Sequence, residues 1–136
     1  MKAIRRILAL AAALALLASC DSRRERSSFV ESGEIRLQVG REVQFRYDPL
    51  KCQLSFNRAR REFRVQTDNV SDYYVATLSE IPVSEGQTLT ADISWTTETD
   101  VLNRKNLALE VVRIEGEKIW LWSDSGRIGL SVVVLE

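Results

Sequence analysis

The sequence predicts an all-β protein, either a small antiparallel β-sandwich or a partly open β-barrel of about seven to nine strands. Apolar residues beyond position 33 recur at every second position, which is the period of a half-buried strand and not of a helix. Short segments rich in Gly, Asp and Asn separate these runs, as expected of turns between antiparallel strands. The 136 residues suffice for one domain.

The first half of the predicted domain, from residue 34, contains alternating runs separated by turns. Gly40 lies between two runs without breaking their phase, so it marks either a bend in one long strand or a tight hairpin. Asn57 to Arg60 supply a turn before a return strand. The apolar members of these runs are Ile35, Leu37, Val39, Val43, Phe45, Tyr47, Cys52, Leu54, Phe56, Phe63 and Val65.

The second half predicts further short strands joined by turns that contain Asp, Asn or Gly. Residues 89–95 form the clearest one-sided strand, which predicts that Trp95 lies in the core. Residues 96–106 show no period and are predicted to form a long loop. The predicted strands of this half are 70–78, 89–95, 107–114, 118–122 and 128–135.

The N-terminal segment has the pattern of an export signal. Lys2, Arg5 and Arg6 precede an uninterrupted apolar run of eleven residues, Ile7 to Leu17. A membrane-spanning helix needs about 20 apolar residues, whereas the core of a signal peptide has about 7 to 15. The run therefore favours export over a permanent span.

The residues that follow this run, Leu17-Ala18-Ser19-Cys20, resemble the lipobox of bacterial lipoproteins. The resemblance implies that residues 1–19 are a signal peptide cut just before Cys20. It also implies a diacylglyceryl group, carrying fatty chains such as palmitate, on the Cys20 thiol. Two or three fatty chains suffice for stable attachment, so we expect the protein on the inner or outer membrane of a bacterial cell envelope.

Residues 20–33 are predicted to be the lipidated N-terminus and a flexible tether, because Asp21 to Ser28 are charged and serine-rich with no apolar period. The globular domain is then predicted over residues 34–136. Without residues 1–19 the chain carries 16 Lys and Arg against 19 Asp and Glu. This mildly acidic balance lacks the basic footprint of a nucleic-acid-binding protein.

The composition argues against an enzyme. The chain has no histidine, which excludes classical triads, imidazole switches and the commonest zinc sites. Lipidation of Cys20 would leave Cys52 as the sole thiol, in phase with core residues and without a histidine to activate it. No catalytic residue, metal or cofactor is predicted, although Glu98 and Asp100 leave a glycosidase-like carboxylate pair as an alternative.

Charge is distributed unevenly along the chain. Residues 41–64 contain seven basic and three acidic side chains, whereas residues 65–100 contain seven acidic and no basic ones. The blocks either pair across neighbouring strands or lie on separate surfaces and promote self-association or partner binding. The acidic block lacks the dense spacing of a calcium loop.

Two groups of residues are candidate contact sites for an envelope glycan or protein. Trp120 and Trp122 share one face of a predicted strand, so they are either buried or form a sugar-stacking platform. A predicted hairpin carries a cluster of basic residues suited to docking an envelope protein: Arg58, Arg60, Arg61 and Arg64. The sequence thus predicts a lipid-anchored binding or structural module and does not predict its oligomeric state.

Overall fold

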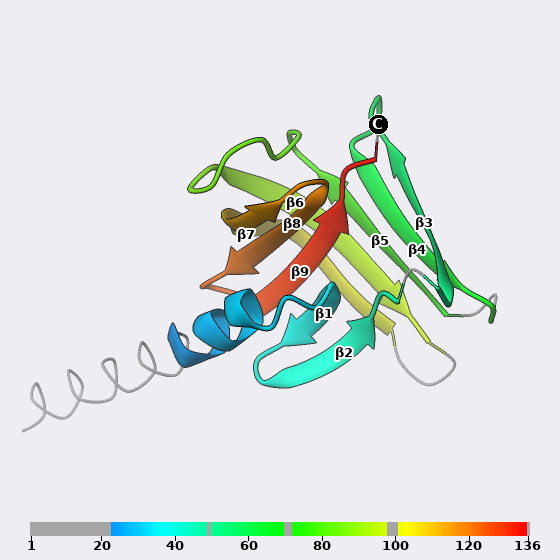
Figure 1. Ribbon diagram of the computed structural model, residues 1–136, viewed down its shortest axis with the longest axis horizontal. Helices are drawn as coiled ribbons and strands as arrows, with labels where there is room; N and C mark the ends of the chain where they lie inside the picture. The colour runs from blue at the N-terminus through cyan, green and yellow to red at the C-terminus, as the bar shows by residue number, and fades with distance from the viewer. Residues whose placement is uncertain (1–22, 49, 70–71, 98–100, 136) are drawn as a thin grey trace, which may run out of the picture.

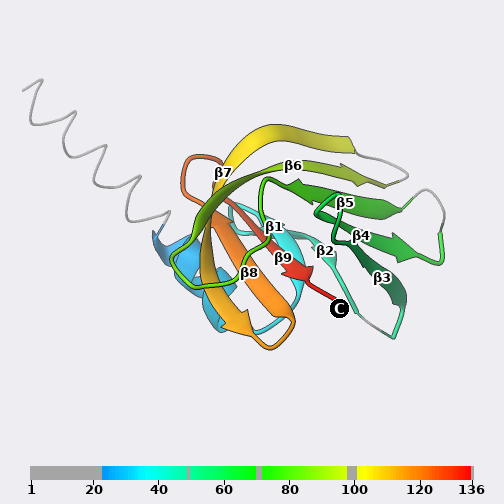
Figure 2. The same ribbon diagram turned by 90° about the horizontal axis from the view of Figure 1, so that it is seen from above.

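Nine antiparallel strands within the described residues form one curled sheet, a half-barrel (Figures 1 and 2). The computed structural model describes residues 23–48, 50–69, 72–97 and 101–135. The strands are β1 (Arg36–Val39), β2 (Glu42–Arg46), β3 (Cys52–Asn57), β4 (Glu62–Thr67), β5 (Tyr73–Leu78), β6 (Thr88–Thr96), β7 (Val101–Glu115), β8 (Lys118–Ser123) and β9 (Ile128–Val133).

The strand order is β2-β1-β9-β8-β7-β6-β5-β4-β3, so β2 and β3 are the two edges of the sheet. The all-β prediction is confirmed. Because all nine strands belong to one sheet and its edges do not pair with each other, the open barrel is the architecture present. Most neighbours in the sheet are consecutive in the chain, and β1 closes onto β9.

The first two strands form a tight hairpin, which settles the alternative at Gly40. Val39 pairs with Glu42, and Gly40 has a φ of +60°. A positive φ at the first position of a two-residue turn suits glycine, because a residue with a Cβ is strained there.

The inner face of the half-barrel holds the main hydrophobic core. Leu37, Phe63, Tyr74 and Leu121 are among its fully buried members. Alternate residues of each strand point inward, as the period of two predicts. Trp95 also belongs to this core and is 6% exposed, which confirms its predicted position.

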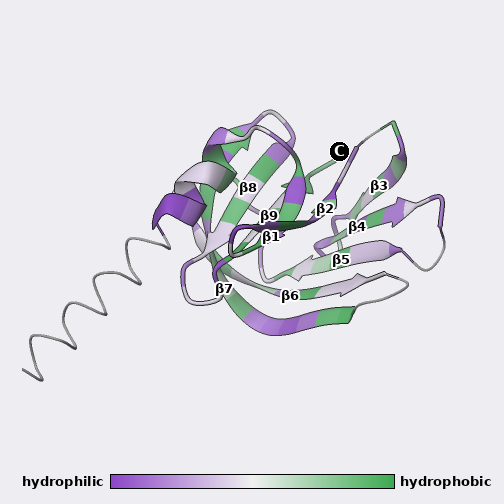
Figure 3. Cartoon of the chain, turned by 90° about the horizontal axis from the view of Figure 1, so that it is seen from below, coloured by the Kyte–Doolittle hydropathy of each residue, from purple (hydrophilic) through white to green (hydrophobic). Residues whose placement is uncertain are grey.

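Residues 23–31 form a helix, so the prediction of a flexible tether over residues 20–33 is wrong for these nine residues; residues 20–22 lie outside the described chain. Phe29 is fully buried and Glu25, one turn earlier, is also buried. The helix packs on the outer face of the sheet beside β8 and β9 (Figure 3). Its first turn is hydrophilic, and its apolar residues, Phe29 and Val30, lie near its end. The prediction failed because one short helix with two buried positions leaves too little apolar periodicity to detect.

The predicted loop over residues 96–106 is also wrong in part, because β7 begins at Val101. The segment 103–106 is exposed. Asn106 has a φ of +54°, and the pairing of β6 with β7 shifts register between Ala91 and Ile93. An exposed strand with an irregular register carries no clean apolar alternation, so its sequence resembles a loop.

Candidate functional site

The predicted lipidation site, Cys20, lies outside the described residues, as do Glu98 and Asp100. In the sequence Cys20 stands three residues before Arg23, where the helix begins.

Trp120 and Trp122 lie beneath the helix and are 0% and 1% exposed. The ring centroids of Trp122 and Phe29 are 5.9 Å apart. Both indole nitrogens donate hydrogen bonds, from Trp120 to the Glu34 carbonyl (2.9 Å) and from Trp122 to Asp124 (3.0 Å). A sugar-stacking platform needs exposed indoles, so the carbohydrate-binding alternative that rested on these two residues is wrong.

Arginines from the sheet hold the C-terminal half of the helix. Arg113 Nη1 donates to the Val30 carbonyl (2.7 Å), and its guanidinium lies 4.8 Å from the ring centroid of Trp120. Arg36 Nη2 lies 3.5 Å from the Ser28 carbonyl. The last carbonyls of a helix lack N–H partners within the helix, so Arg113 satisfies that of Val30, whereas the Ser28 carbonyl also accepts from the Ser32 amide (3.2 Å). Both cations oppose the negative end of the helix dipole.

An ion pair between the buried Glu25 side chain and the half-exposed Arg127 holds the first half of the helix. The Glu25 side chain is 0% exposed and accepts hydrogen bonds from Arg127 Nε (2.9 Å) and Nη2. The hydrogen bond from Arg127 lowers the pKa of Glu25 and outweighs the opposing effect of burial. On the surface, hydrogen bonds from Arg36 and Arg46 lower the pKa of Glu34 in the same way.

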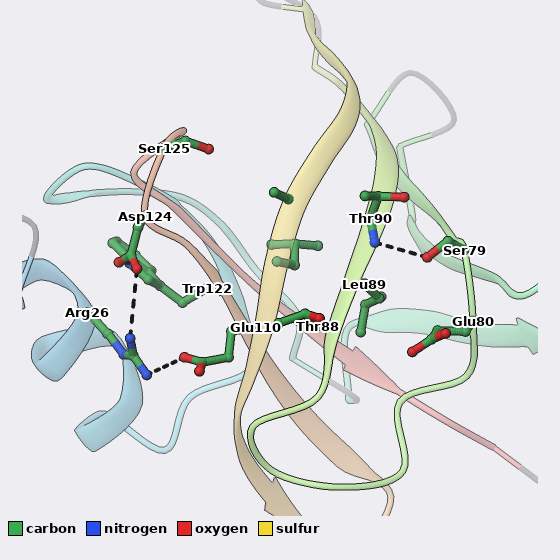
Figure 4. Close-up of a pocket in the computed structure, with 12 residues that line it drawn as sticks. Arg26, Ser79, Glu80, Thr88, Leu89, Thr90, Glu110, Trp122, Asp124 and Ser125 are labelled. Carbon is green, nitrogen blue, oxygen red and sulfur yellow. Dashed lines mark hydrogen bonds and ion pairs between the residues drawn. The ribbon is translucent and has the colours of Figure 1, made fainter.

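A groove of about 700 Å³, lined by both polar and apolar side chains, lies between the helix and the chain that leads into β6 (Figure 4). Arg26 spans its helix side through ion pairs with Glu110 and Asp124. Across the groove the Ser79 hydroxyl accepts a hydrogen bond from the Thr90 amide (2.9 Å). These hydrogen bonds and ion pairs within the protein occupy several of the polar groups that line the groove.

The basic hairpin is the β3–β4 connection. Within the described chain, the guanidinium groups of Arg58 and Arg60 are exposed and have no hydrogen-bond or ion-pair partner. Arg61 differs, because its Nε donates to the Leu78 carbonyl (2.9 Å) and its φ is +53°. Arg64 lies over the ring of Tyr73 (5.8 Å). The four predicted arginines thus divide into two that face solvent and two that pack against β5.

Cys52 begins β3 and is free but only half-buried. Burial raises the pKa of its thiol, with smaller contributions from nearby aspartates. The nucleophilic form of cysteine is the thiolate, so a raised pKa makes Cys52 a weak nucleophile at neutral pH. This supports the expectation that it is not catalytic.

Two buried tyrosines, Tyr47 and Tyr74, stack in the half-barrel with ring centroids 5.4 Å apart. Burial raises the pKa of both phenols. They remain neutral at physiological pH and act as core residues. Sequence alternation placed Tyr47 in a strand facing inward, but nothing in the sequence indicated that the two rings would meet.

The described residues contain no helix long and apolar enough to cross a membrane. They also contain no group of three or more cysteines, aspartates and glutamates placed to hold a metal ion.

Comparison of the chain with known proteins found no match. No protein-family model matches the chain, and no curated protein or solved structure matches it.

Proposed function

We propose that the protein is a bacterial lipoprotein, anchored in a membrane of the cell envelope through Cys20, whose β domain is a binding or structural module without catalytic activity. The observation that carries the proposal is the apolar run ending in Leu17-Ala18-Ser19-Cys20. The absence of histidine and the raised pKa of the Cys52 thiol support a non-catalytic role.

Cysteine substitutions test the anchor. Cells supplied with an alkyne analogue of palmitate should label the wild-type protein and the matched control Cys52→Ala, but not Cys20→Ala. Mass spectrometry of the wild-type protein should find residue 20 at the N-terminus and carrying a diacylglyceryl group. An unmodified Cys20 thiol in the wild-type protein, or equal labelling of Cys20→Ala, would contradict the proposal.

A more specific role, docking of an envelope protein, is favoured by one observation. The unpartnered guanidinium groups of Arg58 and Arg60 lie on the β3–β4 hairpin, across the molecule from the helix that follows the anchor (Figures 1 and 2). Charge at an exposed rim raises association rates and selects partners. On this proposal the anchor and the docking surface occupy different ends of the protein.

The docking role is tested by reversing both charges, with Arg58→Glu and Arg60→Glu together. Co-purification of envelope proteins from detergent-solubilised membranes should weaken, and the loss should mimic that caused by high salt. The matched control reverses two exposed charges on β7, Arg104→Glu and Lys105→Glu. Unchanged partners in the hairpin variant would count against docking through this hairpin.

A further inference from the structure

The edge strand β3 has one side that no strand covers within the described residues. β3 pairs with β4 alone. At Cys52, the first residue of β3, the backbone N–H on this side already has a partner, because it donates to the Asp48 carbonyl (2.8 Å). The available edge is therefore the five residues from Gln53 to Asn57. Uncovered backbone N–H and C=O groups of this kind are a template for another strand.

The side chains of this edge do little to prevent such pairing. Residues 52–57 are Cys-Gln-Leu-Ser-Phe-Asn, with no charge and no proline. Leu54 and Phe56 point toward the core but are only half-buried, whereas Phe63 and Val65, which pair with Phe56 and Leu54 on β4, are fully buried. Natural edge strands are usually protected by charges, prolines or bulges. The exposed part of Leu54 and Phe56 would lose contact with water if a further strand were added.

The two ends of β3 differ in charge. At the Asn57 end the hairpin presents Arg58 and Arg60 without partners. At the Cys52 end a hollow of about 560 Å³ is lined by three carboxylates and two basic groups; its charged residues are Arg46, Asp48, Lys51, Asp68 and Asp72. One end of the edge is thus basic and the other mildly acidic. A strand running in the opposite direction, with the same distribution of charge, sets the basic end of each strand against the mildly acidic end of the other.

We propose that the uncovered edge of β3 is a self-association surface, on which a second copy of the chain adds its own β3 antiparallel about Ser55. Residues opposite each other in an antiparallel pair lie on the same face of the sheet. Centring the pair on Ser55 sets Leu54 opposite the second copy's Phe56, which extends the inner apolar face across the junction. It also pairs the uncovered residues 53–57 of one copy with the same residues of the other. The pairing does not depend on lipidation of Cys20.

This geometry sets Arg58 of each copy opposite Cys52 of the other. The basic hairpin then faces the mildly acidic region described above, in which three carboxylates, Asp68 among them, outnumber two basic groups, and the twofold symmetry repeats the contact. A five-residue strand pair is a small interface, so the association is expected to be weak in dilute solution. Confinement on a membrane, as in the proposed function, would raise the effective concentration of the two copies.

Photo-crosslinking tests whether β3 meets β3. The full chain is prepared with p-benzoylphenylalanine at Ser55, or at Lys105 as a matched exposed control on β7. Light and ¹⁵N-labelled copies are mixed before irradiation. The expected result is a crosslinked peptide that joins position 55 of one copy to residues 51–58 of the other, at least fivefold above the yield from position 105.

Reciprocal charge reversal tests the predicted contacts. The Arg58→Glu/Arg60→Glu variant repels the acidic loop of an identical copy, and the Asp68→Arg variant repels an identical basic hairpin. Sedimentation equilibrium should therefore show self-association of each variant weakened at least tenfold, while Arg104→Glu/Lys105→Glu changes it less than twofold. A mixture of the first two variants should restore association, because both hairpin contacts of the mixed dimer are again attractive.

Three outcomes overturn the inference: a wild-type chain that remains monomeric at millimolar concentration, crosslinks from position 55 that do not reach residues 51–58 of the other copy, or charge variants that do not restore association when mixed. Circular dichroism and thermal unfolding of each variant confirm that it is folded. Recovery in the mixture also separates loss of contact from loss of structure. None of these outcomes bears on the anchor, which is tested by the lipid on Cys20.

Discussion

At Gly129 the helix rests directly on the sheet. A Cβ at this position would lie 2.7 Å from ring atoms of Phe29, closer than carbon atoms can pack. Gly129 pairs with Trp122 on β8, so the ring of Phe29 fills the space that the missing side chain leaves beside the indole. The close approach requires glycine because of space and not because of backbone conformation.

Gly129→Ala should therefore destabilise the protein by about 1–3 kcal/mol, the usual cost of an added methyl group in a packed site. Urea unfolding of the variant measures this loss. In a Phe29→Ala background the same substitution should cost much less, since the clashing ring is gone. Equal costs in the two backgrounds would show that the helix does not rest on Gly129.

The ion pair between Glu25 and Arg127 should make the stability depend on pH. The pKa of Glu25 is lowered in the folded state, whereas an unfolded glutamate titrates near pH 4.3. The stability that it contributes is therefore fully present above about pH 5 and is lost as the pH falls through the lower folded pKa.

Replacing Glu25 with glutamine should remove this dependence. The difference in free energy of unfolding between wild type and Glu25→Gln is expected to shrink steadily from pH 5 to pH 2.5. Glu31→Gln, at an exposed position of the same helix, is the control and should leave the acid profile unchanged. If the difference in free energy of unfolding stayed constant with pH, the pKa of Glu25 would be the same in the folded and unfolded states, which contradicts the prediction.

At the scale of the element, the helix at residues 23–31 acts as a cover for the outer face of β8. Trp120 and Trp122 lie under it, whereas the third tryptophan, Trp95, lies in the inner core. The strand is apolar on both faces because both are covered, one by the barrel interior and one by the helix. Removal of the cover should therefore affect two of the three tryptophans.

Phe29→Asp should release the helix, because a carboxylate replaces a buried ring; removing a buried phenylalanine costs about 3–5 kcal/mol. Tryptophan emission should shift to longer wavelength, and acrylamide should quench more of it, while far-ultraviolet circular dichroism still reports β-structure. Val83→Asp, at an exposed position, is the control. Emission that stays at its wild-type wavelength would show that the helix is not the cover.

The strands were more predictable than the contacts between elements. The alternation of apolar and polar residues from Leu89 to Trp95 identified β6, because one face of that strand is buried and the other faces solvent. The sequence did not predict the helix, because the helix is held on the sheet by arginines far along the chain, such as Arg113 and Arg127. Sequence spacing reports which face of an element is apolar but not which distant cation will meet its carbonyls or carboxylates. The same limit applied to the tryptophans, whose burial depends on the helix.

For the whole molecule, the sheet order places β8 and β9 in the interior and β2 and β3 at the margins. Every residue of β9 is buried, whereas residues of β3 are exposed or half-buried. Local opening takes less free energy where few buried contacts must be broken. Stability should therefore fall from the middle of the sheet toward its edges.

Hydrogen exchange measured by mass spectrometry should reveal this gradient. Amides of β8 and β9 are expected to exchange only through global unfolding, at least a hundredfold more slowly than those of residues 53–57 at low protein concentration. Uniform exchange across the sheet would contradict a fold with open edges. Equally slow exchange at the β3 edge in a dilute, monomeric sample would show that its backbone is covered within one chain.

The docked helix also decides how far the protein can reach. If Cys20 is lipidated as proposed, only two residues separate it from the helix that begins at Arg23, so the β domain is held close to the membrane. Under that proposal the helix, and not a flexible segment of chain, sets the distance between the membrane and the β3–β4 hairpin.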